Sequence, residues 1–275
     1  MKVSTATSVL VGYTLDEAID KVISIGFDGV DIWGGRPHLY RRDYSGDTVS
    51  ALGEKIRKSG LGIVSVMPAF YRYPFSLSSP VEAICRDSVS YMKDCIDNAA
   101  LVEAGYVLVV PMSCLLNQTP AQAHRLIVKN LAEVCDYAAQ KQMKLGLEVL
   151  NPLSCNFMPK AQSAADILNE LKTDCLGVVL DTGEMNLSGE SFDAMLDLMG
   201  DKLFSIHIND NNGVKDTNSI PGEDDCNFDF YALRDTLRKY HYDGYLSLEL
   251  GYHYSSDPIP ALSQAAAAVR DIFVK

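Results

Sequence analysis

The sequence predicts an α/β fold, a single (β/α)8 TIM barrel that spans residues 1–275. Short apolar runs typical of buried strands alternate with amphipathic stretches along the whole chain. Four of these runs carry a carboxylate or an imidazole near their last position, and the ends of several strands are where barrels build their sites. Because no Gly- or Ser-rich linker divides the chain, we expect one domain.

The expected strands are runs of aliphatic and β-branched residues bounded by turn residues. A weak first run at 2–4 precedes seven stronger ones, at 27–33, 61–67, 105–111, 144–150, 176–182, 203–209 and 244–250. Their short length and nearly continuous apolar character indicate parallel strands that are covered on both faces.

Start and stop signals mark the helices between these runs. Thr14 and Glu17 form a capping box, and Gly26 is expected to end that helix. Apolar residues recur at helical spacing over 119–143 and 257–274, and 191–200 is expected to be a further capped helix. Eight strands alternating with eight helices argue for parallel βαβ units. The sequence has no G-x-G-x-x-G after a strand and no P-loop, which weighs against a nucleotide-binding doubly wound sheet.

Three connections after strands are long, at 34–45, 68–80 and 209–229. Loops at this end of a barrel build its site, and long connections without regular structure are often functional. We therefore expect these segments to border a binding site.

Composition limits the classes of protein to consider. The chain is 47% hydrophobic and 22% charged, and its formal net charge of −12 disfavours nucleic acid and favours a neutral or cationic small substrate. The seven cysteines are odd in number and lack CxxC spacing, which predicts free thiols in a reducing compartment. No apolar run is long enough to span a membrane, so we expect a cytoplasmic protein without a membrane partner.

The polar residues at the ends of four apolar runs are Glu148, Asp181, His207 and Glu249. A buried carboxylate or imidazole is unfavourable unless it is paired or bound to a metal. Four such residues in consecutive runs indicate one shared site. Three carboxylates and one imidazole form a hard, oxygen-rich ligand set, which suits Mn²⁺ or Mg²⁺ better than a soft metal.

Five stretches carry a family resemblance: GFDGVDIWGGRPH (26–38), GLEVLNP (146–152), VVLDTGE (178–184), IHINDNNGVKDTNSIPGED (206–224) and SLEL (247–250). Together they resemble the sugar isomerase and epimerase TIM barrels related to xylose isomerase, and within that group the fructoselysine 3-epimerase-like and ketose 3-epimerase proteins. The resemblance implies that the four polar residues bind one divalent cation, Mn²⁺ first, with Mg²⁺, Co²⁺ or Ni²⁺ as alternatives. It also implies a homo-oligomer, a dimer or a tetramer.

The same resemblance implies a metal-dependent isomerase that epimerises a ketose or a ketosamine of the fructoselysine type at C3. Glu148 and Glu249 would then act as proton carriers on opposite faces of the substrate. A proton beside a ketone is too weakly acidic for a free carboxylate, and a cation on the neighbouring oxygens would stabilise the enediolate. Returning the proton to the other face inverts the carbon.

The chain departs from the ketose 3-epimerase pattern at three substrate-contacting positions. Ser154 stands where many members have Glu, Glu184 where they often have His, and Gly213 where some have Arg. The resemblance therefore leaves the sugar open. The added negative charge of Glu184 suits an amine-bearing sugar such as a fructosamine.

Trp33, His38, Glu184 and Asp210 are the expected substrate-binding residues. Trp33 ends the second apolar run, where its ring can stack on a sugar. His38 can hydrogen-bond a sugar hydroxyl, and Asp210 can orient a ligand from behind. Core packing explains Trp33 equally well, and a solvated loop position explains Glu184 equally well.

Three other functions are compatible with the pattern to different degrees. A dehydratase of a polyol ketone, of the inosose dehydratase type, begins with the same proton removal and differs in the mass of its product. An abasic-site endonuclease in the same barrel group needs several metals, and this acidic chain has only five histidines. A sugar-binding protein without catalysis is disfavoured because both proton-carrying carboxylates are present.

Overall fold

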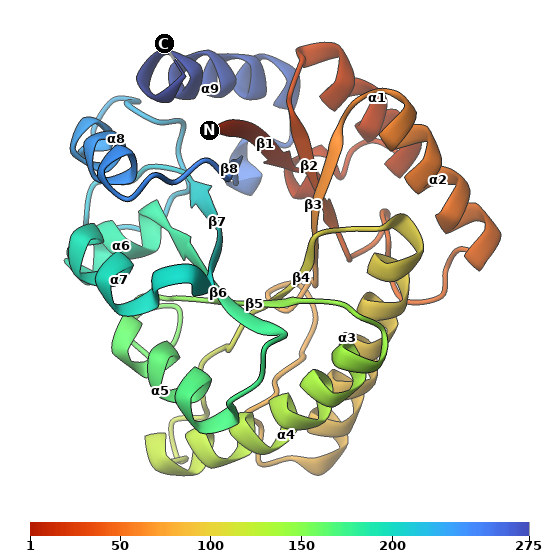
Figure 1. The fold of residues 1–275 in the computed structure, drawn as a ribbon, viewed down its shortest axis with the longest axis vertical. Coiled ribbons are helices and arrows are strands. Elements are labelled where there is room, and N and C mark those ends of the chain that lie inside the picture. Colours follow the sequence, from red (N-terminus) through yellow and green to blue (C-terminus); the bar gives the residue numbers. More distant parts are fainter. Residues whose placement is uncertain (275) are drawn as a thin grey trace.

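A computed structural model describes residues 1–274; Lys275, the last residue of the predicted domain, lies outside them. Eight parallel strands close into a barrel in chain order, with β8 paired to β1 (Figure 1). The strands are β1 (Lys2–Ala6), β2 (Gly29–Trp33), β3 (Gly62–Met67), β4 (Tyr106–Val109), β5 (Leu145–Glu148), β6 (Leu176–Asp181), β7 (Leu203–Ile208) and β8 (Tyr245–Leu248). The predicted (β/α)8 fold is confirmed.

Helices form a ring around the barrel, and α9 lies between α8 and α1 to complete it (Figure 1). The α-helices of the described residues are α1 (Leu15–Ile25), α2 (Gly46–Lys58), α3 (Glu82–Val102), α4 (Pro120–Gln140), α5 (Ala161–Leu171), α6 (Thr182–Ser188), α7 (Phe192–Met199), α8 (Phe230–Lys239) and α9 (Pro258–Phe273). Short 3-10 helices cover Thr7–Leu10, Gly200–Lys202 and Tyr252–Tyr254.

The predicted end signals of α1 are confirmed. The Thr14 hydroxyl accepts a hydrogen bond from the Glu17 backbone, the Glu17 carboxylate accepts one from the Thr14 backbone, and Gly26 is left-handed at φ 87°. The helix expected at 191–200 also forms, but Ser191 makes no capping hydrogen bond with its side chain.

One α-helix of the described residues was not expected from the sequence. The short helix α6 follows β6 directly and has Asp181 as its N-cap, whose carboxylate accepts the Glu184 backbone N–H at 2.8 Å. A carboxylate at a helix N-terminus satisfies a backbone donor and is favoured by the helix dipole. A residue expected only as a site residue therefore also begins a helix.

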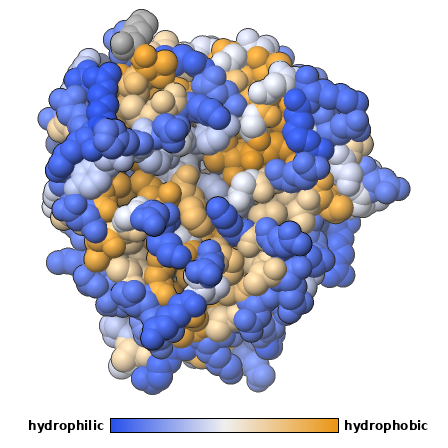
Figure 2. Space-filling view, viewed as in Figure 1, coloured by the Kyte–Doolittle hydropathy of each residue, from blue (hydrophilic) through white to orange (hydrophobic). Residues whose placement is uncertain are grey.

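The core is a continuous cluster of buried apolar side chains that joins the strands to the surrounding helices. Figure 2 shows hydrophilic residues over much of the outer rim of the molecule and hydrophobic residues in patches nearer the middle. Within residues 1–274, no helix combines the length and the apolar character that a membrane crossing requires. The cysteines of this part of the chain are free thiols, as the sequence predicts.

Candidate active site

The ends of four neighbouring strands bring four polar side chains together. Glu148 ends β5, Asp181 ends β6, His207 is the fifth residue of β7, and Glu249 follows β8 directly. Asp181 pairs with His207 across β6 and β7, and side chains of paired residues leave the same face of a sheet. One oxygen or nitrogen atom from each of the four lies within 4.8 Å of the others.

His207 is at the centre of this cluster. Its Nδ1 lies 2.9 Å from Oε1 of Glu148 and 2.8 Å from Oε2 of Glu249. Its side chain is fully buried, and Nε2 has no hydrogen-bond partner among the described residues. Burial disfavours the charged imidazolium, but the two glutamates outweigh it and raise the pKa of His207 well above 6.5.

Glu148 and Asp181 are buried, and burial is the main reason that their pKa values are raised. Within residues 1–274, no Lys or Arg forms an ion pair with any carboxylate of the cluster; Glu148 and Glu249 pair only with His207. One imidazolium compensates only part of the charge of three carboxylates, and this donor set fits a hard divalent cation. These four residues could hold one such ion.

The carboxylate of Asp181 is held on both sides. Oδ1 accepts the Glu184 backbone N–H at 2.8 Å, and Oδ2 accepts the Asn209 side-chain amide at 2.7 Å. The Asn209 backbone N–H in turn donates to the Thr182 hydroxyl at 3.0 Å. Partners of this kind orient metal ligands, and losing one typically weakens metal binding by about 10–100-fold.

Gly183 has no side chain, and the side chain of Asn209 fills the space beside its Cα. A Cβ at this position would lie 2.1 Å from Asn209 Oδ1. We expect Gly183→Ala to lower the free energy of unfolding by about 1–3 kcal/mol through overpacking. It should also weaken divalent-cation binding, because a displaced Asn209 cannot hold Asp181. Denaturant unfolding and calorimetry with Mn²⁺ measure both effects. Gly12→Ala is the control, since a Cβ there comes no closer than 4.0 Å to the Ser255 carbonyl oxygen. Unchanged Mn²⁺ affinity in Gly183→Ala would contradict the expectation.

The cluster opens into a cavity of about 480 Å³. Its lining residues are Ser8, Trp33, Tyr71, Glu148, Asp181, Glu184, Asp216, Thr217, Asn218, Glu249, Leu250, Gly251, Tyr252 and His253. Three aromatic rings can pack against a sugar, and two carboxylates outside the cluster, Glu184 and Asp216, add negative charge. None of the lining residues is Lys or Arg, so the cavity favours a neutral or cationic ligand. The sequence reasoning did not single out Asp216, which lies in an irregular loop without a periodic signal.

Glu184 is fixed at the wall of the cavity. Its Oε2 accepts two hydrogen bonds at 2.6 Å from the backbone and side chain of Asn151, and its Oε1 accepts one at 3.0 Å from the Ser154 hydroxyl. Burial raises the pKa of Glu184 to about 8, against the hydrogen bond from the Asn151 backbone. The structure thus places Ser154 and Glu184, two of the three departures from the ketose 3-epimerase pattern, in direct contact.

The third departure, Gly213, lies in the turn that follows β7. Its φ is 73°, in the left-handed region that disfavours residues with a Cβ. Its N–H donates to Asn211 Oδ1 at 2.9 Å. An Arg at this position would be strained in the present turn.

The structure brings two of the four expected substrate-binding residues, Trp33 and Glu184, to the cavity. Asp210 and His38 are not among its lining residues. The Asp210 carboxylate accepts backbone N–H groups of Asn211, Gly222 and Phe228 at 2.8–3.2 Å, so it holds the loop after β7 together. A short acid after a strand can therefore order a loop from within instead of facing the ligand.

His38 is fully buried beside the barrel. Its Nδ1 lies 3.1 Å from the Thr7 hydroxyl and its Nε2 lies 3.3 Å from the Tyr13 carbonyl oxygen. Both ring nitrogens therefore have partners within the protein. Burial lowers the pKa of His38 to about 4, although its hydrogen bond to the Tyr13 backbone carbonyl opposes the shift.

This pKa predicts how stability depends on pH. The unfolded chain binds a proton on His38 at a higher pH than the folded protein does. The neutral imidazole therefore contributes fully to the free energy of unfolding above pH 6.5. This contribution, of up to about 3 kcal/mol, is lost as the pH falls toward 4. We expect His38→Asn to flatten the decline in unfolding free energy between pH 7 and pH 4.5. His241→Asn, on the exposed surface, is the control and should keep the wild-type slope. An unaltered slope in His38→Asn would contradict the assignment.

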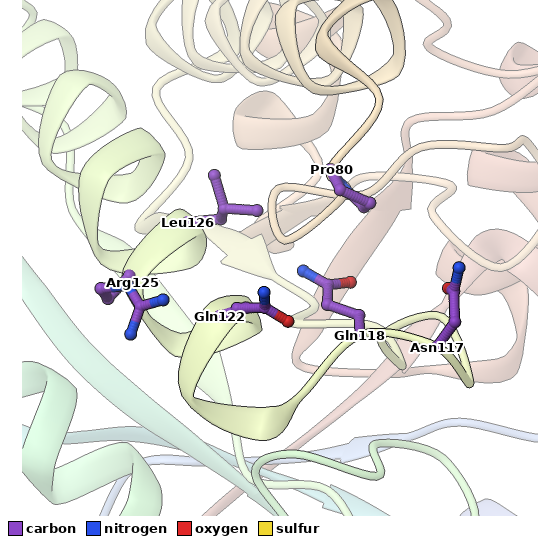
Figure 3. A pocket seen from close by; sticks show the side chains of 6 residues that line it. All are labelled: Pro80, Asn117, Gln118, Gln122, Arg125 and Leu126. Atoms are coloured by element: carbon purple, nitrogen blue, oxygen red, sulfur yellow. The ribbon is translucent and has the colours of Figure 1, made fainter.

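Another cavity lies between the segment before α3 and the start of α4. Figure 3 shows the side chains that line it: Pro80, Asn117, Gln118, Gln122, Arg125 and Leu126. The Gln118 amide donates to the Ser78 carbonyl at 2.8 Å, and Gln122 Oε1 accepts the Thr119 N–H at 2.9 Å. These amides serve local structure, and the lining has no carboxylate or imidazole for proton transfer.

Comparison with known proteins identifies the family. The family model described as xylose isomerase-like TIM barrel matches residues 19–272. This chain belongs to the xylose isomerase-like TIM barrel family. The resemblance inferred from the sequence is therefore confirmed.

Individual relatives agree with this membership. The fructoselysine 3-epimerase of Shigella flexneri is 29% identical over 247 residues, which cover 89% of this chain and 88% of the relative. The apo crystal structure of an Escherichia coli 3-keto-D-glucoside 4-epimerase has a TM-score of 0.82 at 19% identity and covers 98% of this chain and 99% of its own. A crystal structure of IOLI protein with a bound zinc atom has a TM-score of 0.80 at 20% identity, with coverage of 99% and 98%. The predicted enzyme class, an isomerase or epimerase, is confirmed.

Proposed function

We propose that this family member is a divalent-metal-dependent sugar 3-epimerase that acts on a ketose or a ketosamine through one barrel domain. The observation that carries the proposal is the cluster of three carboxylates and His207, whose carboxylates, Glu148, Asp181 and Glu249, also line the cavity. Mn²⁺ is the proposed ion, with Mg²⁺, Co²⁺ or Ni²⁺ as alternatives. A homo-oligomer and a cytoplasmic location are part of the proposal.

Glu148 and Glu249 suit proton transfer because they reach the cavity from different strands. Glu148 ends β5, Glu249 follows β8, and their carboxylates approach His207 Nδ1 together. In the proposed reaction one carboxylate takes the proton from C3 and the other returns a proton to the opposite face. A divalent cation bound by the cluster would stabilise the negative charge that develops on the sugar oxygens. Trp33, Tyr71 and Tyr252 would hold the sugar ring and limit access of water.

The charge of the cavity favours a substrate that bears an amine. Glu184 and Asp216 add two carboxylates beyond the cluster, and no lining side chain is Lys or Arg. Burial raises the pKa of Glu184 to about 8, and an ammonium group beside it would favour the charged carboxylate, which a neutral ketose would not do. The Shigella relative is named for fructoselysine, a sugar joined to an amine, which supports the same substrate class.

Changing Glu184 tests this preference. We expect Glu184→Gln to reduce the ratio of kcat/KM for fructosamines over neutral ketoses by about 10-fold, which corresponds to roughly 1.4 kcal/mol. The amide keeps the size of the side chain but removes its charge. Glu190→Gln is the control, because Glu190 accepts the Ala161 N–H and does not line the cavity. An unchanged ratio in Glu184→Gln would exclude Glu184 as the source of the preference.

The reaction is tested by incubating the Mn²⁺-loaded enzyme in D₂O with a panel of ketoses and fructosamines. Deuterium at C3 of a product with unchanged carbon skeleton supports epimerisation, whereas deuterium at C1 indicates aldose–ketose isomerisation. A product that has lost water indicates the dehydratase. Tight sugar binding without exchange at any carbon indicates a binding protein and contradicts the proposal.

A further inference from the structure

An arginine without a carboxylate partner lies at the mouth of the acidic cavity. Arg72 belongs to the long connection after β3, and its guanidinium carbon lies 4.5 Å from the centre of the Tyr252 ring, in the segment after β8. Tyr252 lines the cavity, and so does Tyr71, the neighbour of Arg72 in the chain. Arg72 is exposed, and among residues 1–274 its side chain has no ion pair and no hydrogen-bond acceptor.

The contact between Arg72 and Tyr252 reaches across part of the barrel mouth. In the barrel, β3 and β8 are separated by β1 and β2. Trp33, the last residue of β2, and Ser8, in the 3-10 helix after β1, line the cavity. Burial raises the pKa of Tyr252; Arg72 opposes this shift and Glu249 adds to it, so the phenol lies within reach of both charges. The guanidinium therefore lies at the rim of the cavity into which the metal-binding cluster opens.

The backbone that carries Arg72 is held in place. Its N–H donates to the Ala69 carbonyl at 3.1 Å, in a turn flanked by the buried rings of Phe70 and Phe75. Phe75 stacks on Tyr91 of α3, with ring centroids 4.2 Å apart. Because the turn is already ordered, less conformational entropy is lost when its arginine binds an anion.

The charges of the site change sign between the cavity and its rim. Glu184 and Asp216 line the cavity, whereas Arg72 lies at the rim. A ketosamine formed from an amino acid carries its charges in the complementary order, with the protonated amine beside the sugar and the carboxylate further out. A phosphate on the sugar fits less well, because its charge of about −2 would be repelled by the two cavity carboxylates.

We propose that Arg72 is a specificity-determining residue that binds the carboxylate of an amino acid joined to the sugar, so that the substrates are ketosamines of amino acids. This inference rests on the proposed function, because it requires a ketosamine in the cavity. A guanidinium presents paired N–H donors that match the two oxygens of a carboxylate. Its contact with the Tyr252 ring places these donors beside the cavity.

Two matched pairs of probes test the inference. One pair is fructosyl-6-aminohexanoate and its neutral amide, and the other is fructosylglycine and fructosylglycinamide. Within a pair only the charge of the terminal group differs. Calorimetry with the Mn²⁺-loaded protein gives the Kd of each probe. We expect the wild-type protein to bind the carboxylate about 10-fold more tightly than the amide in at least one pair. Arg72→Gln should bring this ratio close to one, and Arg72→Glu should make the amide the tighter ligand.

The ratio separates recognition of the carboxylate from damage to the loop. Loss of the contact with Tyr252 alone would weaken binding of both members of a pair equally and leave the ratio unchanged. Arg125→Gln is the matched control, because Arg125 is also exposed and without an ion pair in the described chain, but it lines the other cavity (Figure 3). It should keep the wild-type ratio.

The outcomes distinguish this inference from the proposed function. If the enzyme epimerises sugars but the ratio is the same in the wild type and Arg72→Gln, the proposed function stands and the inference is overturned. If the ratio depends on Arg72 in a protein that inverts no sugar, the inference stands and the epimerase fails. Failure to bind any of the four probes would overturn the inference. So would a preference for a 6-phosphorylated ketose that Arg72→Gln removes while no preference for the carboxylate exists.

Discussion

Glu249→Gln and Glu148→Gln are each expected to lower the kcat for C3 epimerisation by about 10²–10⁴-fold. Both side chains line the cavity, and both lie within 2.9 Å of His207 Nδ1. Glutamine keeps the size and one carbonyl oxygen, so it can still contact an ion, but it cannot accept the proton from carbon. Inversion needs one carboxylate for each face, so neither glutamate can substitute for the other.

The measurement is epimer formation together with deuterium uptake in D₂O, at Mn²⁺ concentrations that calorimetry shows to be saturating for each variant. A variant that retains one proton carrier should exchange deuterium at C3 without inverting the carbon. Glu223→Gln is the control, because Glu223 accepts the Tyr254 hydroxyl and does not line the cavity. Wild-type inversion in either active-site variant would refute the assignment of two proton carriers.

Asp181→Asn is expected to change protein stability in opposite directions with and without metal. In the metal-free protein, burial and the neighbouring Glu184 and Glu249 raise the pKa of Asp181, which means that its charge is unfavourable there. An amide of the same size should therefore raise the free energy of unfolding by about 1–3 kcal/mol in EDTA. Asn209 can accommodate the change by rotating its amide, since its Oδ1 has no partner in the described chain.

With saturating Mn²⁺, Asp181→Asn should instead lower the free energy of unfolding relative to the wild-type protein. Binding at about 1,000 times the Kd adds roughly 4 kcal/mol to the stability of a protein that binds the ion, and a variant that lacks a charged ligand loses much of this. Thermal or denaturant unfolding in EDTA and in Mn²⁺ gives both values. Asp94→Asn provides the contrast, because loss of its ion pairs with Arg41 and Arg42 should destabilise the protein equally in both conditions. If Asp181→Asn changed the free energy of unfolding by the same amount and in the same direction with and without Mn²⁺, Asp181 would be ruled out as a ligand.

Much of the fold could be read from local patterns. The capping box of Thr14 and Glu17 and the left-handed Gly26 bound α1 as predicted, because end signals act through neighbouring backbone groups. The strand that contains Glu148 and the one that contains Asp181 were recognisable because buried parallel strands are continuously apolar. The short helix α6 was missed, since its N-cap Asp181 had been assigned to the metal alone.

The roles of single polar residues were harder to predict. His38 and Asp210 follow strands just as Trp33 does, yet His38 bonds within the protein and Asp210 ties a loop together. Arg72 was overlooked because its contact, the ring of Tyr252, follows a different strand. Sequence position says that a side chain is near a strand end, but which partner it meets depends on residues that are distant in the chain.

By itself, the sequence determined the barrel, the order of its strands and the convergence of Glu148, Asp181, His207 and Glu249. Parallel strands that close into a barrel have their carboxyl ends at one mouth, and alternate side chains of each strand face the interior. Only the tertiary structure decided the contact between Ser154 and Glu184, the acidic cavity, and the contact of Arg72 with Tyr252. The physical reason is that hydrogen bonds and burial depend on which side chains closure of the barrel places within a few ångströms of one another, and separation along the chain does not encode these distances.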